Sequence, residues 1–120
     1  MDAEQIRAAA AKQFSEENNA LLKVDVPEWG EGAAIYYRPR LTVREVEQIA
    51  PRMDVNIVTM NLTTFILCAR DSEGKRIYSS AATESLRSGS LAIDPRVLTR
   101  IVYEMGYFRD KDLEADAKKH

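Results

Sequence analysis

The chain has 120 residues, a length that suits one domain with a single hydrophobic core and excludes two independent domains. Hydrophobic residues make up 45% of the sequence and charged residues 30%, with only five glycines and four prolines, which excludes disordered and fibrous classes. The formal net charge of -2 argues against bulk electrostatic binding to nucleic acid or to an anionic membrane.

The sequence offers no segment for membrane insertion or export. No apolar run is long enough to cross a bilayer, and the residues after Met1 lack the basic and apolar regions of a secretory signal. The expected location is therefore the cytoplasm. The single cysteine, Cys68, lies in an apolar run, where a buried and inert thiol is expected. The lone histidine, His120, is the last residue.

The first predicted element is a helix from Asp2 to about Glu17. Its composition favours a helix strongly, but its apolar stripe is thin and consists of Ile6, Ala10 and Phe14. A helix with so little apolar surface can pack on the domain, pack on a neighbouring copy, or fray.

A β-hairpin is expected next, between about Val24 and Tyr37. Val24 and Val26 alternate with polar residues on the first strand, Ile35 and Tyr37 alternate on the second, and glycines lie in the loop between them. Prolines border both strands, so the hairpin is expected to be short and to lie at a sheet edge.

Two helices are predicted after the hairpin. Thr42 and Glu45 form a capping box that starts a short helix, which Pro51 should end or bend. The expected apolar face of this helix comprises Val43, Val46, Ile49 and Ala50. The segment 56–68 is apolar nearly all round and is interpreted as a helix, the core spine, although its Val, Ile and Thr content also suits a strand.

The remaining elements are shorter. The segment 71–75 is a polar turn, and 76–79 has strand character and could join the hairpin. A short helix should run from Ser80 or Thr83 to about Arg87. A stronger helix is predicted for 95–105, with Asp94 as N-cap and Gly106 as stop signal, and with Leu98, Ile101, Val102 and Met105 facing the core.

These elements define an α+β fold, with a small antiparallel β-hairpin or three-stranded sheet packed with four to five α-helices. The expected division is an N-terminal Ala-rich helix over 1–20, an α+β domain over 21–108 and a charged C-terminal tail over 109–120.

The residues offer no catalytic site. The only histidine is terminal, so Ser/His/Asp and Cys/His sets are excluded, and no cluster of metal ligands is present. The segment 72–75 ends in Gly-Lys but lacks the upstream glycines of a phosphate-binding loop. We therefore expect no catalytic residues, no metal and no cofactor, and a protein that is not an enzyme.

Two charge patterns bear on binding. Acidic residues predominate up to Glu31, whereas Arg38, Arg40, Arg44 and Arg52 make the next segment basic, a distribution that suits head-to-tail contacts between copies. The run from Tyr36 to Arg40 interleaves aromatic and basic residues, as single-strand nucleic-acid binding sites do. The acidic balance of the whole chain argues against that second interpretation.

The order of several short motifs resembles the tail assembly chaperones of long-tailed bacteriophages and prophages. These motifs are Val24-x-Val26-Pro27-Glu28-Trp29-Gly30, a strand ending in Tyr37-Arg38-Pro39, the helix start Leu41-Thr42-x-x-Glu45, and the run from Leu67 to Tyr78 that contains Asp71-Ser72-Glu73-Gly74-Lys75. The apolar helix after Asp94-Pro95 also fits, so the resemblance spans about 24–105.

This resemblance implies a non-catalytic protein of the bacterial host cytoplasm. It would bind the tape measure protein, keep that protein soluble, recruit the tail tube protein and form homo-oligomers, with no membrane or nucleic-acid partner. Members of the family are often also made as a longer product by translational frameshifting. Codons for Ala117-Lys118-Lys119 could carry the slippery run that such a frameshift needs.

A helix held in an apolar groove is the physical way to bind an amphipathic segment, and self-association could build such a groove. The candidate residues for partner binding or self-association are Trp29, Tyr36, Tyr37, Arg38, Arg40, Arg44, Leu86 and Leu91. Ordinary packing is the competing interpretation for each, and it is weakest for Trp29, because a tryptophan at a loop tip is hard to bury locally. The alternative function is a small phage-encoded interaction or regulatory module that binds a host protein or single-stranded nucleic acid.

Overall fold

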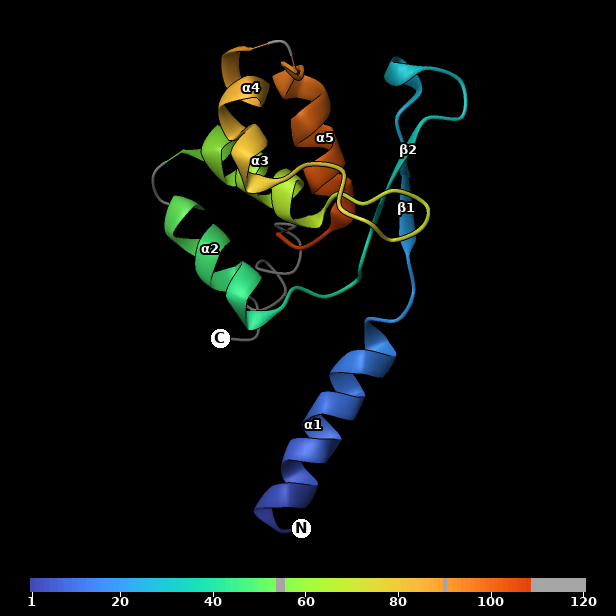
Figure 1. Cartoon of the computed structure of the whole chain (residues 1–120), viewed down its shortest axis with the longest axis vertical. Coiled ribbons are helices and arrows are strands. Elements are labelled where there is room, and N and C mark those ends of the chain that lie inside the picture. Colours follow the sequence, from blue (N-terminus) through green and yellow to red (C-terminus); the bar gives the residue numbers. More distant parts are fainter. Residues whose placement is uncertain (54–55, 90, 109–120) are drawn as a thin grey trace, which may run out of the picture.

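One apolar helix forms the centre of the fold in the computed structural model, which describes residues 1–53, 56–89 and 91–108 (Figure 1). The elements in chain order are α1 (Ala3–Glu17), β1 (Leu22–Asp25), the 3-10 turn η1 (Pro27–Trp29), β2 (Ala34–Tyr37), α2 (Val43–Met53), α3 (Ile57–Cys68), the 3-10 turn η2 (Ser80–Ala82), α4 (Thr83–Ser88) and α5 (Pro95–Met105). The predicted α+β class is confirmed.

Helix α3 is the predicted spine. Asn56 starts it by accepting hydrogen bonds from the backbone N–H groups of Val58 and Thr59. Seven of its side chains are buried, and α2 and α5 pack against it. Its most central side chain, Phe65, is fully buried. The helical interpretation of this segment is therefore confirmed. Its apolar residues lie on several sides of the helix, and neighbouring elements cover them from more than one direction.

The hairpin forms with the predicted alternation. Val24 pairs with Ile35 in an antiparallel ladder, and the buried side chains of the hairpin region are Val24, Val26, Ile35 and Tyr37. The hairpin lies beside α5, and α2 lies on the other side of α3 (Figure 1).

The third strand does not form among the described residues. Arg70 makes single-residue bridges to Tyr36 and to Arg76, and the pairing extends no further. The chain leaves the ladder at Asp71, whose carboxylate accepts hydrogen bonds from the N–H groups of Glu73 and Lys75 and holds a tight turn. The sheet therefore has two strands, and the three-stranded alternative is wrong.

Helix α2 departs from prediction in two ways. Its capping box is present, since Thr42 and Glu45 each accept a hydrogen bond from the other's backbone N–H. Pro51 lies inside the helix, however, with two helical residues after it, so the missing N–H affects only the last turn. Of the predicted apolar face only Ile49 is buried, whereas Val43 and Val46 are exposed.

The end of the domain follows the predicted caps. Asp94 accepts a hydrogen bond from the Arg96 N–H at the start of α5, and Gly106 ends the helix with φ 81°, a left-handed conformation that favours glycine. The side chains of Leu98, Ile101, Val102 and Met105 are buried as predicted, together with Val97.

Helix α1 projects away from the body of the molecule (Figure 1). It has a capping box of Asp2 and Gln5 and no buried residue. The radius of gyration is 16.2 Å, whereas a compact domain of this length has about 13–14 Å. The last turn of α1 is tied to the body at Arg40. The Arg40 guanidinium lies 3.5 Å from the Glu17 carboxylate, and the Arg40 backbone N–H donates a hydrogen bond to Asn18 Oδ1. The predicted tail over 109–120 lies outside the described residues.

The orientation of α2 can be tested with two matched substitutions. Ile49→Ala removes a fully buried side chain and should lower the free energy of unfolding by about 2–5 kcal/mol. Val43→Ala, in the same helix but 76% exposed, should change it by less than about 0.5 kcal/mol. Urea denaturation measures both, and similar losses for the two variants would contradict the observed orientation of α2.

A candidate protein-binding surface

Trp29 lies at the hairpin tip, at the end of η1. The Val26 N–H donates to the Ala33 carbonyl and closes the loop, while the Trp29 N–H donates to the Val26 carbonyl. The indole ring meets Phe65 edge-on, with ring centroids 6.4 Å apart, yet 42% of the residue remains exposed. Trp29 therefore packs partly on the core and keeps a substantial part of its surface open to a partner.

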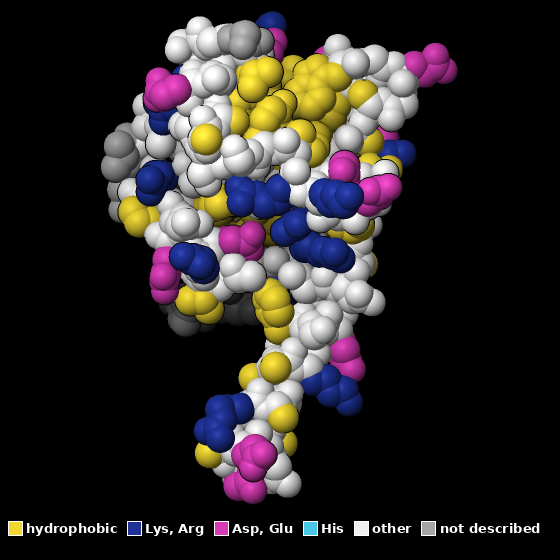
Figure 2. Space-filling view, in the orientation of Figure 1, with side chains coloured by type: hydrophobic (Ala, Val, Ile, Leu, Met, Phe, Trp, Pro, Cys, Tyr) yellow, Lys and Arg dark blue, Asp and Glu magenta, His cyan; other side chains and the backbone are white. Residues whose placement is uncertain are grey.

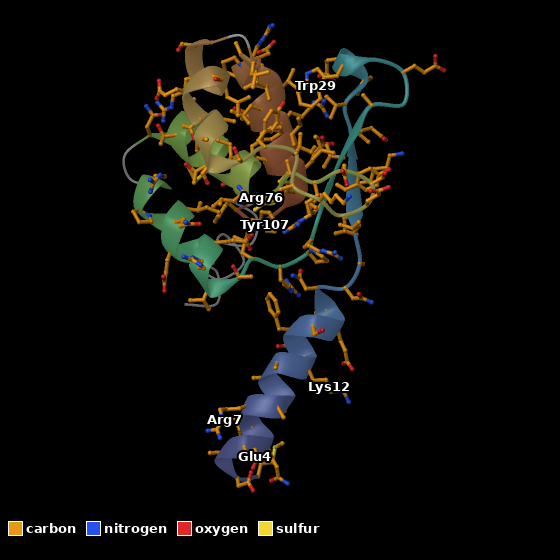
Figure 3. The ribbon with its side chains drawn as sticks, viewed as in Figure 1. Glu4, Arg7, Lys12, Trp29, Arg76 and Tyr107 are labelled. Carbon is orange, nitrogen blue, oxygen red and sulfur yellow. The ribbon has the colours of Figure 1, made fainter. Side chains whose placement is uncertain are left out.

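The neighbourhood of Trp29 is apolar. The half-buried Tyr78 also packs on Phe65, with centroids 5.5 Å apart. Figure 2 shows hydrophobic side chains gathered on this face beside α4 and α5, where Figure 3 labels Trp29. We call Trp29, Tyr78 and the core residue beneath them, Phe65, the Trp29 surface.

Arg100 on α5 holds the hairpin tip in place. Its guanidinium donates to Glu28 Oε1 at 2.7 Å, to the Asp25 carbonyl at 3.2 Å and to Glu104 Oε2 at 2.7 Å. A hydrogen bond from the backbone N–H of Glu28, reinforced by Arg100, holds the pKa of that carboxyl below its ordinary value. These contacts fix the loop on α5, so the Trp29 surface is positioned before any partner arrives.

The two leucines proposed for binding differ in exposure. Leu91 is 50% exposed and accessible, whereas Leu86 is only 2% exposed and belongs to the hydrophobic core. The prediction that Leu86 contacts a partner at the surface is wrong, because α4 turns that side chain inward.

The adjacent tyrosines point to opposite faces, as strand alternation requires. Tyr37 is buried, its hydroxyl donates to the Glu104 carbonyl at 3.4 Å, and its ring meets Tyr107 edge-on. Tyr36 is half-buried and exchanges backbone hydrogen bonds with Arg70. The outward member of the pair is therefore Tyr36.

The three proposed arginines lie apart from Trp29. Arg38 donates to the Asn19 carbonyl at 2.7 Å, Arg40 pairs with Glu17, and Arg44 is exposed on α2. They line two hollows between the end of α1, α2 and the segment around Arg70, and Trp29 lines neither. The sequence candidates therefore divide between two surfaces.

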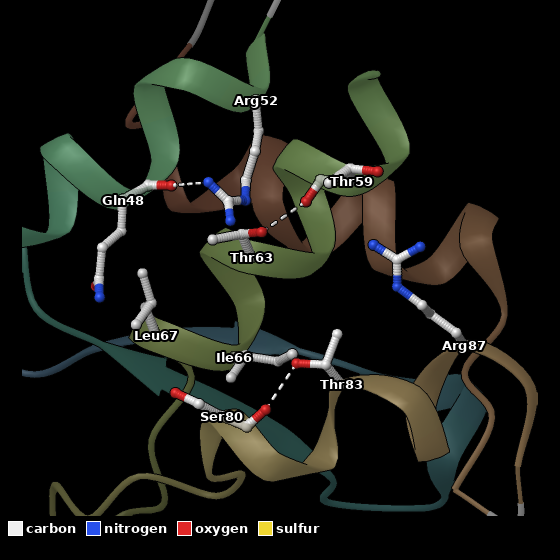
Figure 4. Close-up of a pocket in the computed structure, with 9 residues that line it drawn as sticks. All are labelled: Gln48, Arg52, Thr59, Thr63, Ile66, Leu67, Ser80, Thr83 and Arg87. Atoms are coloured by element: carbon white, nitrogen blue, oxygen red, sulfur yellow. Dashed lines mark hydrogen bonds between the residues drawn. The ribbon is translucent and has the colours of Figure 1, made fainter. Parts of the chain in front are cut away.

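A further hollow of about 280 Å³ lies between α2, α3 and the η2–α4 segment (Figure 4). Ile66 and Leu67 contribute its apolar part, and Arg52 of α2 and Arg87 of α4 also line it. Sequence reasoning missed Arg87 as a site residue, because it is remote from the other arginines along the chain and only the packing of α4 brings it here.

Two buried titratable groups have pKa values above their ordinary range. Burial is the main cause that raises the pKa of the Cys68 thiol to about 12, and burial also raises the pKa of Tyr107, whose hydroxyl donates to the Arg38 carbonyl. Within the described ranges, no three His, Cys, Asp or Glu side chains lie close enough to hold a metal ion. No helix in that part of the chain is both long and apolar enough to span a bilayer.

The fold is similar to that of a phage tail assembly chaperone. The structure of the tail assembly chaperone of bacteriophage HK97 superposes with a TM-score of 0.51 over 78% of this chain and 94% of that chain, at 18% sequence identity. At this identity the similarity establishes a shared fold, and it confirms at that level the resemblance seen in the motifs. The sequence matches no protein-family model and no curated protein.

The state of Cys68 gives a direct test of the core. With its pKa raised to about 12, the thiol is protonated at pH 8, and it is also 3% exposed. An aromatic disulfide reagent should therefore react with the folded protein only as fast as the protein opens. The same protein in guanidinium chloride should react at the rate of an ordinary thiol. Rapid reaction of the folded protein would contradict this packing.

Proposed function

We propose that this protein is a tail assembly chaperone of a long-tailed phage or prophage. In this role it binds the tape measure protein in the host cytoplasm, keeps it soluble and promotes assembly of the tail tube, without catalysis. The shared fold with the HK97 tail assembly chaperone carries this proposal. The order of motifs along the sequence supports it independently.

The Trp29 surface suits such a client. A long helical protein exposes apolar stripes that aggregate until they are covered. An aromatic side chain with a fixed backbone and an open face binds an apolar stripe at low entropic cost, because few rotamers are lost. Trp29 has this character, and the exposed Leu91 adds apolar area on the same domain.

The nucleic-acid alternative has less support. It depends on aromatic and basic side chains that project together from the run 36–40. Tyr37 is buried there, and Arg38 and Arg40 are engaged with the Asn19 carbonyl and the Glu17 carboxylate. Only Tyr36 keeps a partly open ring in this run.

Co-expression with a tape measure protein and co-purification tests the proposed role. Trp29→Ala should weaken capture of the client by roughly tenfold or more, which is the usual effect of removing an aromatic hot spot. Tyr103→Ala, which removes a 61% exposed aromatic side chain on α5, is the matched control and should leave capture unchanged.

Thermal unfolding of both variants separates binding from folding. If the Trp29→Ala variant is unfolded at the temperature of the co-expression, Trp29 is a core residue, and the proposal that it binds the client fails. If wild-type protein captures no tape measure protein, the chaperone role itself fails.

Self-association is the second part of the proposal, and α1 is its best support. The helix has 15 residues and none is buried, and an isolated helix of that length is only marginally stable in water. Contact between α1 and a second copy would cover its stripe of Ile6, Ala10 and Phe14 and stabilise the helix.

A charge on the apolar stripe tests this contact. Ile6→Asp should shift the concentration-dependent mass distribution in sedimentation velocity toward the monomer, since Ile6 is 55% exposed and a buried carboxylate would be costly at an interface. Ala8→Asp introduces the same charge on the opposite side of the helix and should leave the distribution unchanged. Equal behaviour of both variants would exclude α1 as the contact.

A further inference from the structure

The hollows beside α2 form one groove. The hollow of about 280 Å³ shares Gln48, Leu67 and Ser80 with a neighbouring hollow of about 330 Å³. That second hollow shares Thr42, Glu45 and Arg70 with a smaller one of about 50 Å³ at the end of α1. The groove therefore runs from the end of α1, along α2, to α4, so it extends over several elements rather than forming one small pocket.

Arginines line the whole length of this groove. Arg44, Arg70 and Arg76 lie in its middle. Arg52 and Arg87 stand at the α4 end. Arg38 and Arg40 line the α1 end, where they already contact the Asn19 carbonyl and the Glu17 carboxylate, so among the described residues the unpaired charge lies in the middle and at the α4 end. We call this the arginine groove. Figure 2 shows Lys and Arg side chains across the middle of one face, where Figure 3 labels Arg76.

The charge of the groove is opposite to that of the chain. The chain has 19 acidic residues and a net charge of -2, yet Glu45 is the one carboxylate among the described residues that line the groove. Glu45 already accepts a hydrogen bond from the Thr42 N–H. Like charges gathered along one groove repel one another, and carboxylates from another molecule would offset that repulsion.

Hydrogen bonds position three of the arginines without neutralising them. Arg52 donates to the Gln48 carbonyl, Arg70 to the Gly74 carbonyl and Arg76 to the Ile66 carbonyl. Each guanidinium has five N–H donors, so most of its donors remain for a ligand. The planar fork of arginine matches a carboxylate with two parallel hydrogen bonds, which a lysine cannot do.

The lining favours carboxylates over nucleic acid. Single-stranded nucleic acid needs aromatic side chains on which bases stack. Tyr107 is the one aromatic residue among the described groove residues, and it is half-buried with its hydroxyl bonded to the Arg38 carbonyl. We propose that the arginine groove binds an acidic segment of a partner protein, with Arg44 and Arg87 among the residues that hold its carboxylates.

A labelled peptide of ten glutamates tests this proposal by fluorescence anisotropy at low ionic strength. The wild-type protein should bind the peptide, and added salt should weaken binding. Arg44→Glu combined with Arg87→Glu should weaken it by about tenfold or more for each arginine. Both side chains are exposed, so folding should persist, and Arg44→Gln with Arg87→Gln is the milder pair if it does not.

The matched control is Arg7→Glu with Lys12→Glu on α1, which changes the net charge equally outside the groove. The control pair should keep near wild-type affinity. No binding of the peptide, equal loss in both pairs, or tighter binding of a labelled ten-nucleotide thymidylate with the same arginine dependence would each overturn the proposal. The assay uses a synthetic peptide and no tail protein. The arginine-groove proposal and the proposed chaperone role can therefore fail independently of each other.

Discussion

The burial of most of α3, from Met60 to Cys68, is the constraint on which the rest of the structure depends. A helix that is apolar nearly all round gains stability only if other elements remove every face from water. Helices α2 and α5 pack on it, and α4 and the hairpin complete a core that contains the fully buried Phe65. Because Phe65 also contacts Trp29 and Tyr78, the same burial positions the aromatic residues of the Trp29 surface.

Polar contacts then decide how this core is displayed. Arg100 ties the hairpin tip to α5, and Arg70 ties the outer edge of β2 to the turn that follows α3. The first contact leaves Trp29 partly open on a fixed loop. The second brings Arg70 and Arg76 next to α2, where they join the arginine groove. One core thus supports an apolar surface and a basic one, which together would suit a client with apolar and acidic segments.

Local chemistry made much of the fold predictable. Helix caps depend on residues within one turn of the chain, so they can be predicted from the sequence. The structure confirms the capping box of Thr42 and Glu45, the Asp94 cap and the left-handed Gly106. The alternation on the hairpin likewise identified the buried residues. The errors at α2 and at the third strand arose where a rule gives only a local tendency. Pro51 disturbs one turn, and a segment with strand character pairs only where the rest of the chain holds it against another strand.

The sequence by itself determined the helices and the hairpin, the caps at Thr42, Asp94 and Gly106, the apolar character of α3, the buried stripe of α5, and the lack of a histidine-based catalytic set. Tertiary structure alone decided which surface residues lie together. It placed Leu86 in the core, turned Val43 and Val46 outward, and gathered arginines from four separate segments along one groove. The physical reason is that side-chain burial and charge clustering depend on how helices pack across the chain, which no local pattern encodes.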